Sequence, residues 1–181
     1  MIYLFLAEGF EEVEALTPVD LLRRAGKTVV TVGISGKTVT GARGIPVVAD
    51  ITADEMVLDD ALEMVILPGG MPGTLHLGES DTVKKAVMYM HERKRLIAAI
   101  CAAPTVFGSM GLLEGRTATC YPGMESGLTG AETSAEPVCR DGHIITSRGV
   151  GTAIPFALAL IDALCPAGTS GKIAESVVYD Q

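Results

Sequence analysis

Cys101 is the residue whose surroundings in the sequence most clearly suggest chemistry. It follows the apolar run Leu96–Ile100, a predicted buried strand, and it precedes a predicted helix, with small neighbours in the segment AICAA. A tight strand-to-helix turn needs such neighbours and projects its middle side chain outward, as in the nucleophile elbow of hydrolases. We therefore predict a nucleophilic cysteine whose thiol pKa is lowered by the helix N-terminus. The alternative is an inert, buried cysteine.

A pair of glycines follows another predicted strand. Met64–Leu67 is an apolar run that ends in Pro68, Gly69 and Gly70. Without a side chain, a backbone N–H group at such a position can approach a ligand closely. Together with the N–H of Ala102 it would form an oxyanion hole. The alternative is an ordinary turn.

Glu14 is the candidate acid. It lies in the predicted helix Glu11–Ala25 and shares a face with Thr17, Pro18 and Leu21. Pro18 lacks the N–H that would bond to the Glu14 carbonyl, so we expect the helix to bend or loosen there. A carboxyl buried beside this defect would have a raised pKa and would hydrogen-bond a thiolate or move protons. The alternative is a solvated acid, like the neighbouring Glu11 and Glu12.

Alternating strands and helices position these residues. Predicted strands are Ile2–Leu6, Thr28–Val32, Met64–Leu67, Leu96–Ile100, Thr117–Cys120 and Ile144–Thr146. Predicted helices are Glu11–Ala25, Asp81–Arg93 with Ser80 as its cap, Ala102–Gly111, Thr152–Leu164 with Thr152 as its cap, and Lys172–Val178. Short Val, Thr and Ile segments around glycines between Gly33 and Asp50 indicate a small hairpin excursion.

This order predicts one α/β domain over residues 1–181, with a mostly parallel sheet and helices on both faces. Ligands of such sheets bind at the carboxyl ends of the strands. Cys101, the two glycines and Arg148 all follow predicted strands, so we expect them at one edge of the sheet.

Composition excludes several classes of protein. Of the 181 residues, 48% are hydrophobic and 20% are charged, which argues against disorder. The net charge is −8, Trp is absent and no basic cluster is longer than Arg93-Lys94-Arg95, so we expect no nucleic-acid partner. The longest apolar stretch, Ala153–Cys165, contains a proline and an aspartate and is too short to span a bilayer.

Four cysteines stand without a CxxC pair or a His/Cys cluster, so neither a structural zinc site nor a disulfide framework is expected. The N-terminus has no basic leader and soon becomes acidic, which is a poor signal peptide. Cys120, Cys139 in a polar loop, and Cys165 at a helix end have no assigned role. We predict a reducing, cytoplasmic setting.

Four motifs occur in order along the chain. They are Glu11–Ala15 with Pro18–Asp20, Leu67–Gly70, Ala99–Pro104 and Thr146–Thr152. Together they closely resemble the ThiJ/PfpI superfamily, in the branch of the Parkinson-disease-linked protein deglycase, and the resemblance covers nearly the whole chain. It implies a flavodoxin-like three-layer sandwich, usually a homodimer, with a reactive elbow cysteine.

The resemblance also implies roles for single residues. Cys101 matches the family nucleophile, and Glu14 matches the protonated glutamate that hydrogen-bonds it. Gly70 and Ala102 match backbone donors around the site. Arg148 and Arg43 match two arginines that frame an anion-binding pocket in that branch of the family.

The sequence departs from this family in its histidines. Related proteins carry a histidine directly after the cysteine or before a proline in a later loop, whereas this chain has Ala102 and Tyr121-Pro122. We expect His76 at the surface, His91 on the solvated side of a charged helix and His143 in a turn after Gly142. This leaves no Cys-His-acid triad and argues against peptidase activity. Tyr121 is the candidate hydrogen-bond donor in place of the histidine.

Three hypotheses follow. The first is a cofactor-independent enzyme of glyoxalase III or deglycase type, in which the Cys101 thiolate adds to a small aldehyde such as methylglyoxal or to a glycated amine, giving lactate in the first case. The second is an oxidative-stress sensor in which Cys101 oxidises to sulfinic acid with little turnover. The third is a holding chaperone.

Overall fold

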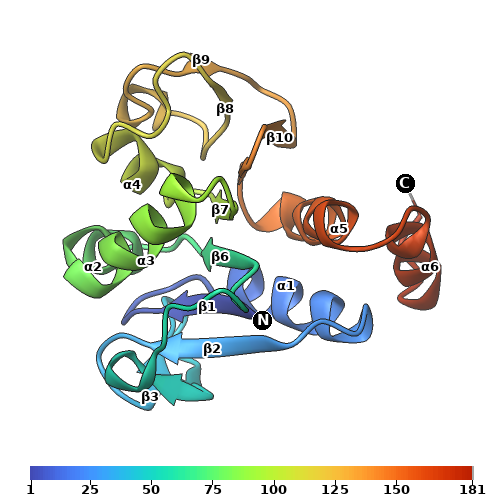
Figure 1. Ribbon diagram of the computed structural model, residues 1–181, viewed down its shortest axis with the longest axis horizontal. Helices are drawn as coiled ribbons and strands as arrows, with labels where there is room; N and C mark the ends of the chain where they lie inside the picture. Colours follow the sequence, from blue (N-terminus) through green and yellow to red (C-terminus); the bar gives the residue numbers. More distant parts are fainter. Residues whose placement is uncertain (181) are drawn as a thin grey trace.

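The computed structural model describes residues 1–180, and its central sheet has seven strands. Figure 1 shows this sheet between two groups of helices. The strand order is β10-β11-β7-β6-β1-β2-β5, and every neighbouring pair is parallel except β10 with β11. These strands are β1 Ile2–Leu6, β2 Val29–Gly33, β5 Ile51–Thr52, β6 Met64–Leu67, β7 Leu96–Ile100, β10 Val138–Asp141 and β11 Ile144–Ser147.

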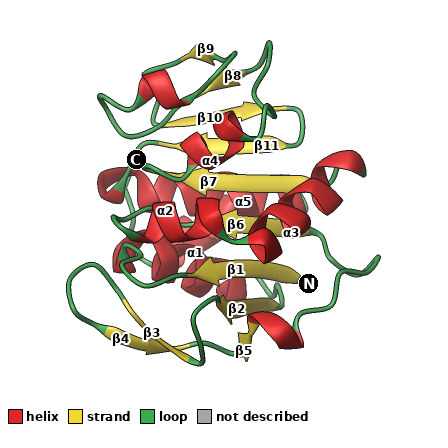
Figure 2. Cartoon of the chain, turned by 90° about the vertical axis from the view of Figure 1, so that its left-hand side faces the viewer, coloured by secondary structure: helices red, strands yellow, loops and turns green. Residues whose placement is uncertain are grey.

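Helices cover both faces of this sheet. On one face lie α1 Glu12–Arg24, α5 Ala153–Leu164 and α6 Thr169–Ser176; on the other lie α2 Gly73–Glu79, α3 Asp81–Glu92 and α4 Pro104–Ser109 (Figures 1 and 2). Three short 3₁₀ helices are η1 Ala53–Glu55, η2 Glu125–Gly127 and η3 Val150–Thr152. The predicted flavodoxin-like three-layer sandwich is therefore confirmed.

Successive side chains of a buried strand point to opposite faces of the sheet and so contribute to both hydrophobic cores. Ile2 and Leu4 of β1 pack in the cluster formed with α1 and α5, whereas Tyr3 and Phe5 pack in the cluster formed with α3 and α4. All four side chains are at most 3% exposed. Complete burial of such an apolar side chain contributes about 1.5–3 kcal/mol, so a strand buried on both faces reads as a continuous apolar run.

Of the two helix caps predicted from the sequence, Ser80 is confirmed and Thr152 is not. Ser80 accepts a hydrogen bond from the Val83 N–H, as predicted for the start of α3. Thr152 precedes α5, but its hydroxyl does not cap that helix. It instead accepts the backbone N–H groups of Arg148 and Gly149, at 3.2 and 3.1 Å.

The glycine-rich segment after β2 forms the predicted hairpin, with β3 Thr38–Thr40 antiparallel to β4 Pro46–Val48. Figure 2 shows it projecting beyond the edge of the main sheet. The strand predicted at Thr117–Cys120 is present but shorter: β8 Thr117–Ala118 pairs with β9 Glu132–Thr133 in a separate sheet.

Two other boundaries differ from the prediction. The helix expected from Ala102 begins only at Pro104, and the C-terminal helix begins at Thr169 instead of Lys172. Cys139 was expected in a polar loop, which is wrong: it lies on β10, opposite Thr146 of β11, and is 7% exposed. Strand β10 pairs with β11 and also packs against β8 and α5, which places Cys139 in the interior.

The topology fixes where a ligand can bind. Strand β1 pairs with β2 on one side and with β6 on the other, so connections leave these strands in opposite directions. Apart from the short edge strand β5, the parallel strands β2, β1, β6, β7 and β11 lie in the spatial order 2-1-3-4-5 when they are numbered along the chain. The crevice of such a sheet lies at the carboxyl ends of the strands around this reversal.

Candidate active site

Cys101 occupies a sharp elbow at the end of β7. Its φ of 65° lies in the left-handed region, which is uncommon for a residue with a side chain. The backbone holds this conformation on both sides: the Cys101 N–H donates to the Ser147 carbonyl at 3.0 Å, and the Cys101 carbonyl accepts the Tyr121 N–H at 2.7 Å. Local strain of this kind costs on the order of 1–3 kcal/mol and persists only where neighbours enforce it.

Glu14 lies in the first turn of α1 and is fully buried. Its Oε2 accepts the Gly69 N–H at 3.0 Å, and the Gly69 carbonyl in turn accepts the Glu11 N–H at 2.9 Å. The start of α1 is thus bonded to the loop after β6. The other carboxylate oxygen, Oε1, has no hydrogen-bond partner within residues 1–180.

Gly69 separates the carboxyl from the cysteine. A Cβ added at this position would lie 2.6 Å from Cys101 Cβ and 2.6 Å from Glu14 Oε2. Contacts this short exclude any side chain, so the two groups approach each other across the bare glycine backbone. The helix, the glycine loop and the elbow together bring Glu14 to Cys101.

The pKa of Glu14 is raised from 4.5 to about 7. Burial is the largest cause, because it disfavours the charged form, and the negative charge of Glu11 adds to it. The interaction with Cys101 and the Gly69 N–H act in the opposite direction. At neutral pH this carboxyl therefore exchanges a proton readily, as a general acid or base must.

The pKa of Cys101 is raised to about 12, so the predicted lowering is wrong. Burial is the largest cause, followed by the charge of Glu14 and its interaction with the thiol. The backbone N–H groups of Gly70 and Ala102 lower the pKa but do not outweigh these effects. Helix α4 begins three residues beyond the sulfur, at Pro104, and contributes little at that distance.

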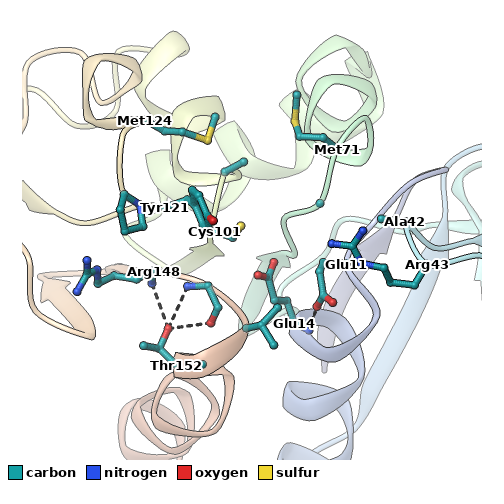
Figure 3. A pocket seen from close by; sticks show the side chains of 16 residues that line it. Glu11, Glu14, Ala42, Arg43, Met71, Cys101, Tyr121, Met124, Arg148 and Thr152 are labelled. Atoms are coloured by element: carbon teal, nitrogen blue, oxygen red, sulfur yellow. Dashed lines mark hydrogen bonds between the residues drawn. The ribbon is translucent and has the colours of Figure 1, made fainter.

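A pocket of about 690 Å³ opens above this pair (Figure 3). The predicted residues Glu14, Cys101, Gly70, Ala102, Arg43, Tyr121 and Arg148 all line it. Gly69 does not, because it lies behind Glu14 as its hydrogen-bond donor. Further lining residues are Glu11, Ala42, Met71, Pro122, Met124, Gly149, Val150, Gly151 and Thr152.

The two arginines of the pocket differ in their partners. Arg148 Nη1 donates to the Ala135 carbonyl at 3.1 Å, and its side chain points away from Glu14 (Figure 3). Arg43 is exposed, and its guanidinium makes no hydrogen bond or ion pair with any residue from 1 to 180. In Figure 3 it extends from the hairpin toward the side of the pocket where Glu11 and Glu14 lie. Arg43 is therefore the arginine that is available to an anion.

The three histidines lie away from the pocket. His76 is exposed and bonds the Glu8 carbonyl at 2.8 Å, while His91 and His143 contact each other through ring nitrogens 3.1 Å apart. Tyr121 lines the pocket and is 52% exposed; its ring lies near Gly149. The structure thus assembles a cysteine, a carboxyl and a phenol at this site, without a histidine.

Sequence reasoning missed the burial of two acids beside Glu14. Glu11 and Glu12 were expected to be solvated, but they are only 9% and 4% exposed. The Glu11 carboxylate caps α1 by accepting the Glu14 N–H at 2.8 Å, while Glu12 lies under the hairpin loop. Glu is not among the residues preferred at a helix N-cap, so the sequence offered no specific signal for this role.

Within the part of the chain that the structure describes, no group of three or more His, Cys, Asp or Glu side chains is arranged to hold a metal ion. No helix between residues 1 and 180 is long and apolar enough to cross a membrane.

Comparison with known proteins identifies the relatives of this chain. The model of the DJ-1/PfpI family matches residues 1–163. The Parkinson disease protein 7 homolog of Danio rerio is 36% identical over 96% of this chain and 94% of its own length. The glutathione-independent glyoxalase DJR-1.2 of Caenorhabditis elegans is 33% identical over 87% of this chain and 84% of its length. The crystal structure of Drosophila melanogaster DJ-1beta superposes with a TM-score of 0.93 at 35% identity, covering 99% of this chain and 98% of that one.

Proposed function

The chain belongs to the DJ-1/PfpI family, and on this basis we propose that it is a cofactor-independent enzyme that converts small 2-oxoaldehydes to 2-hydroxy acids. The observation that carries the proposal is a cysteine beside a buried carboxyl whose pKa is about 7. One relative bears the name of a glutathione-independent glyoxalase, which agrees with this reaction class. Methylglyoxal is the simplest such substrate, and lactate is its product.

The first step joins the sulfur to the aldehyde carbon. Because the thiol pKa is high, the resting cysteine carries its proton at neutral pH and the Glu14 carboxylate receives that proton as the S–C bond forms. The aldehyde oxygen becomes negative in the transition state, where the N–H groups of Gly70 and Ala102 stabilise it. Glu14 then returns the proton to that oxygen, which yields a neutral hemithioacetal.

The second step moves a hydrogen within the substrate. Glu14 removes the proton from the former aldehyde carbon and delivers it to the neighbouring ketone carbon. The hydroxyl proton of the hemithioacetal passes to the former ketone oxygen, so that a 2-hydroxy thioester on Cys101 results. Water then attacks the thioester carbon; lactate leaves, and the sulfur regains its proton. No electron enters or leaves, so the sum is methylglyoxal plus water giving lactate and a proton.

Lactate formation from methylglyoxal tests this proposal. We expect Cys101→Ser to abolish turnover and Glu14→Gln to lower kcat by about 10²–10⁴-fold, the range of general acid–base contributions. Cys165→Ser is a matched control, because Cys165 is partly buried like Cys101 but lies at the end of α5. Equal rates in the wild type and in Cys101→Ser would contradict the role of Cys101.

Glycated amines are the second substrate class that the same addition chemistry permits. The redox-sensor hypothesis has less support, because oxidation proceeds through the thiolate and the raised pKa of Cys101 keeps the thiol protonated. A reducing, cytoplasmic setting and the single domain stay predictions.

We further propose that the enzyme is a homodimer. Helix α1 and the hairpin present Val13, Leu16 and Ile45 at 46%, 39% and 52% exposure around a groove of about 690 Å³. A contiguous exposed apolar surface of this kind is typical of an interface. Sedimentation equilibrium is expected to give twice the chain mass for the wild type and the single mass for Leu16→Glu; a monomeric wild type would contradict the dimer.

A further inference from the structure

Glu12 is a buried carboxylate that the proposed reaction does not use. It is 4% exposed, and its Oε1 accepts the backbone N–H groups of Arg43 and Ile45, at 2.8 and 3.4 Å. Both donors belong to the loop that joins β3 to β4. One carboxylate oxygen from α1 therefore holds the loop on which Arg43 is carried.

The loop is shaped around this carboxylate. A Cβ on Gly41 would lie 2.3 Å from Glu12 Cδ, so the glycine lets the loop close directly over the acid. The loop is closed by a hydrogen bond from the Gly41 N–H to the Ile45 carbonyl at 3.0 Å. A second bond, from the Ala42 N–H to the Phe10 carbonyl at 2.7 Å, ties the loop to the segment before α1.

The same loop forms one wall of the Cys101 pocket. Ala42 and Arg43 line this pocket together with Glu14 and Cys101, and the Arg43 guanidinium points toward it in Figure 3. A guanidinium binds carboxylate and phosphate groups strongly when its position is fixed beforehand. Within residues 1–180 the Arg43 guanidinium makes no hydrogen bond or ion pair that would fix it, so its position depends on the backbone of the loop.

We propose that Glu12 is a positioning residue whose carboxylate holds Arg43 at the mouth of the Cys101 pocket, and that it thereby sets the preference of this site for reactants that carry a negative charge. The inference rests on the proposed function only in taking Cys101 as the reacting group. A role in stability alone would leave the discrimination between charged and neutral reactants unchanged.

Alkylation of Cys101 tests this without enzymatic turnover. Iodoacetate is an anion and iodoacetamide is its neutral counterpart, so the ratio of their alkylation rates, followed at the Cys101 peptide by mass spectrometry, reports the local positive charge. Relative to the wild type, we expect Arg43→Ala to lower the iodoacetate/iodoacetamide rate ratio by about 5–10-fold at low salt, because a cation near the sulfur attracts the anion.

The Glu12 variants separate anchoring from charge. Glu12→Gln keeps an oxygen that accepts the loop N–H groups but removes a negative charge, so its ratio stays at or above the wild-type value. Glu12→Ala removes the anchor, and its ratio falls to that of Arg43→Ala even though a negative charge has also been removed. In the double variant Glu12→Ala/Arg43→Ala the ratio falls no further than in either single variant, because both substitutions remove the same interaction.

Glu12→Asp replaces Glu12→Ala as the test of anchoring if the alanine variant does not fold. It keeps the charge but withdraws the carboxylate from the loop by one methylene, so the ratio falls here as well. The proposal is overturned if the Glu12→Ala ratio, or the Glu12→Asp ratio in its place, stays at or above the wild-type value. It is also overturned if that variant changes both alkylation rates by the same factor, or if Arg43→Ala leaves the ratio unchanged. Absence of lactate formation would overturn the proposed reaction but would leave this result intact.

Discussion

Gly69→Ala should separate the two reacting groups without changing either of them. The added methyl would lie 2.6 Å from both Cys101 Cβ and Glu14 Oε2, and 3.0 Å from the Ile100 carbonyl oxygen. Ordinary contact begins at 3.4 Å, so the cysteine and the carboxyl must each move about 0.8 Å from the methyl or the loop must be displaced. Gly69 has no positive φ, so the substitution acts through space and not through backbone conformation.

The expected effect on activity exceeds the effect on stability. Overpacking of a buried site costs about 1–3 kcal/mol, and each kcal/mol lowers the Tm of a chain of this size by roughly 2–4 °C. Misplacement of reacting groups by about 1 Å lowers turnover on the order of 10²-fold. Gly69→Ala should therefore remain folded at 25 °C and lose at least 99% of its lactate-forming activity, measured beside its thermal melting curve.

Gly171→Ala is the matched control for this substitution. Gly171 lies within α6, and a Cβ there meets no atom within 4 Å, so the variant should keep full activity and gain about 0.5–1 kcal/mol from helix propensity. Wild-type activity in Gly69→Ala, with an unchanged Tm, would refute the close approach of Cys101 and Glu14.

Three further predictions follow from the charged groups. Glu11→Gln removes a negative charge that raises the pKa of Glu14, so the acid limb of the kcat/KM profile should move below pH 7; an unmoved limb would contradict this coupling. The folded-state pKa of Glu14 lies above its ordinary value of 4.5, so its contribution to stability is present below pH 4.5 and is lost as the pH rises through 7. Relative to Glu14→Gln, the wild type should lose about 3 kcal/mol of unfolding free energy between pH 4.5 and 8 in urea titrations, whereas parallel curves would exclude the raised pKa. Burial and neighbouring cations lower the pKa values of His91 and His143, so the Tm should fall as the pH drops below 6.5, and His143→Gln should reduce that fall.

Elements whose burial follows from local sequence were predicted well. Strands β6 and β7 begin and end at the predicted residues, because runs such as Met64–Leu67 are apolar throughout and are covered on both faces. Glu14 was selected from its helix face and from the resemblance, and the structure places it in the pocket beside Cys101. Such features need only the periodicity of a short segment or a motif to be recognised.

Features that depend on distant segments were not predictable in this way. Glu12 is buried by a hairpin loop about 30 positions later, and Cys139 lies on β10, which packs against β8 and α5. The predicted direction of the Cys101 pKa shift was wrong for the same reason. The local elbow suggests a helix dipole, whereas the depth of the site and the charge of Glu14, from another part of the chain, decide the outcome.

Direct titration of the Glu14 carboxyl tests the central claim, that a protonatable carboxyl works beside Cys101 at neutral pH. Infrared difference spectra between pH 4 and 9, taken for the wild type and for Glu14→Gln, isolate the protonated carboxyl band of this residue. We predict a band that disappears with a midpoint near pH 7 in the wild type and is missing in the variant. A midpoint near 4.5, or the same band in both proteins, would contradict the proposed role of Glu14.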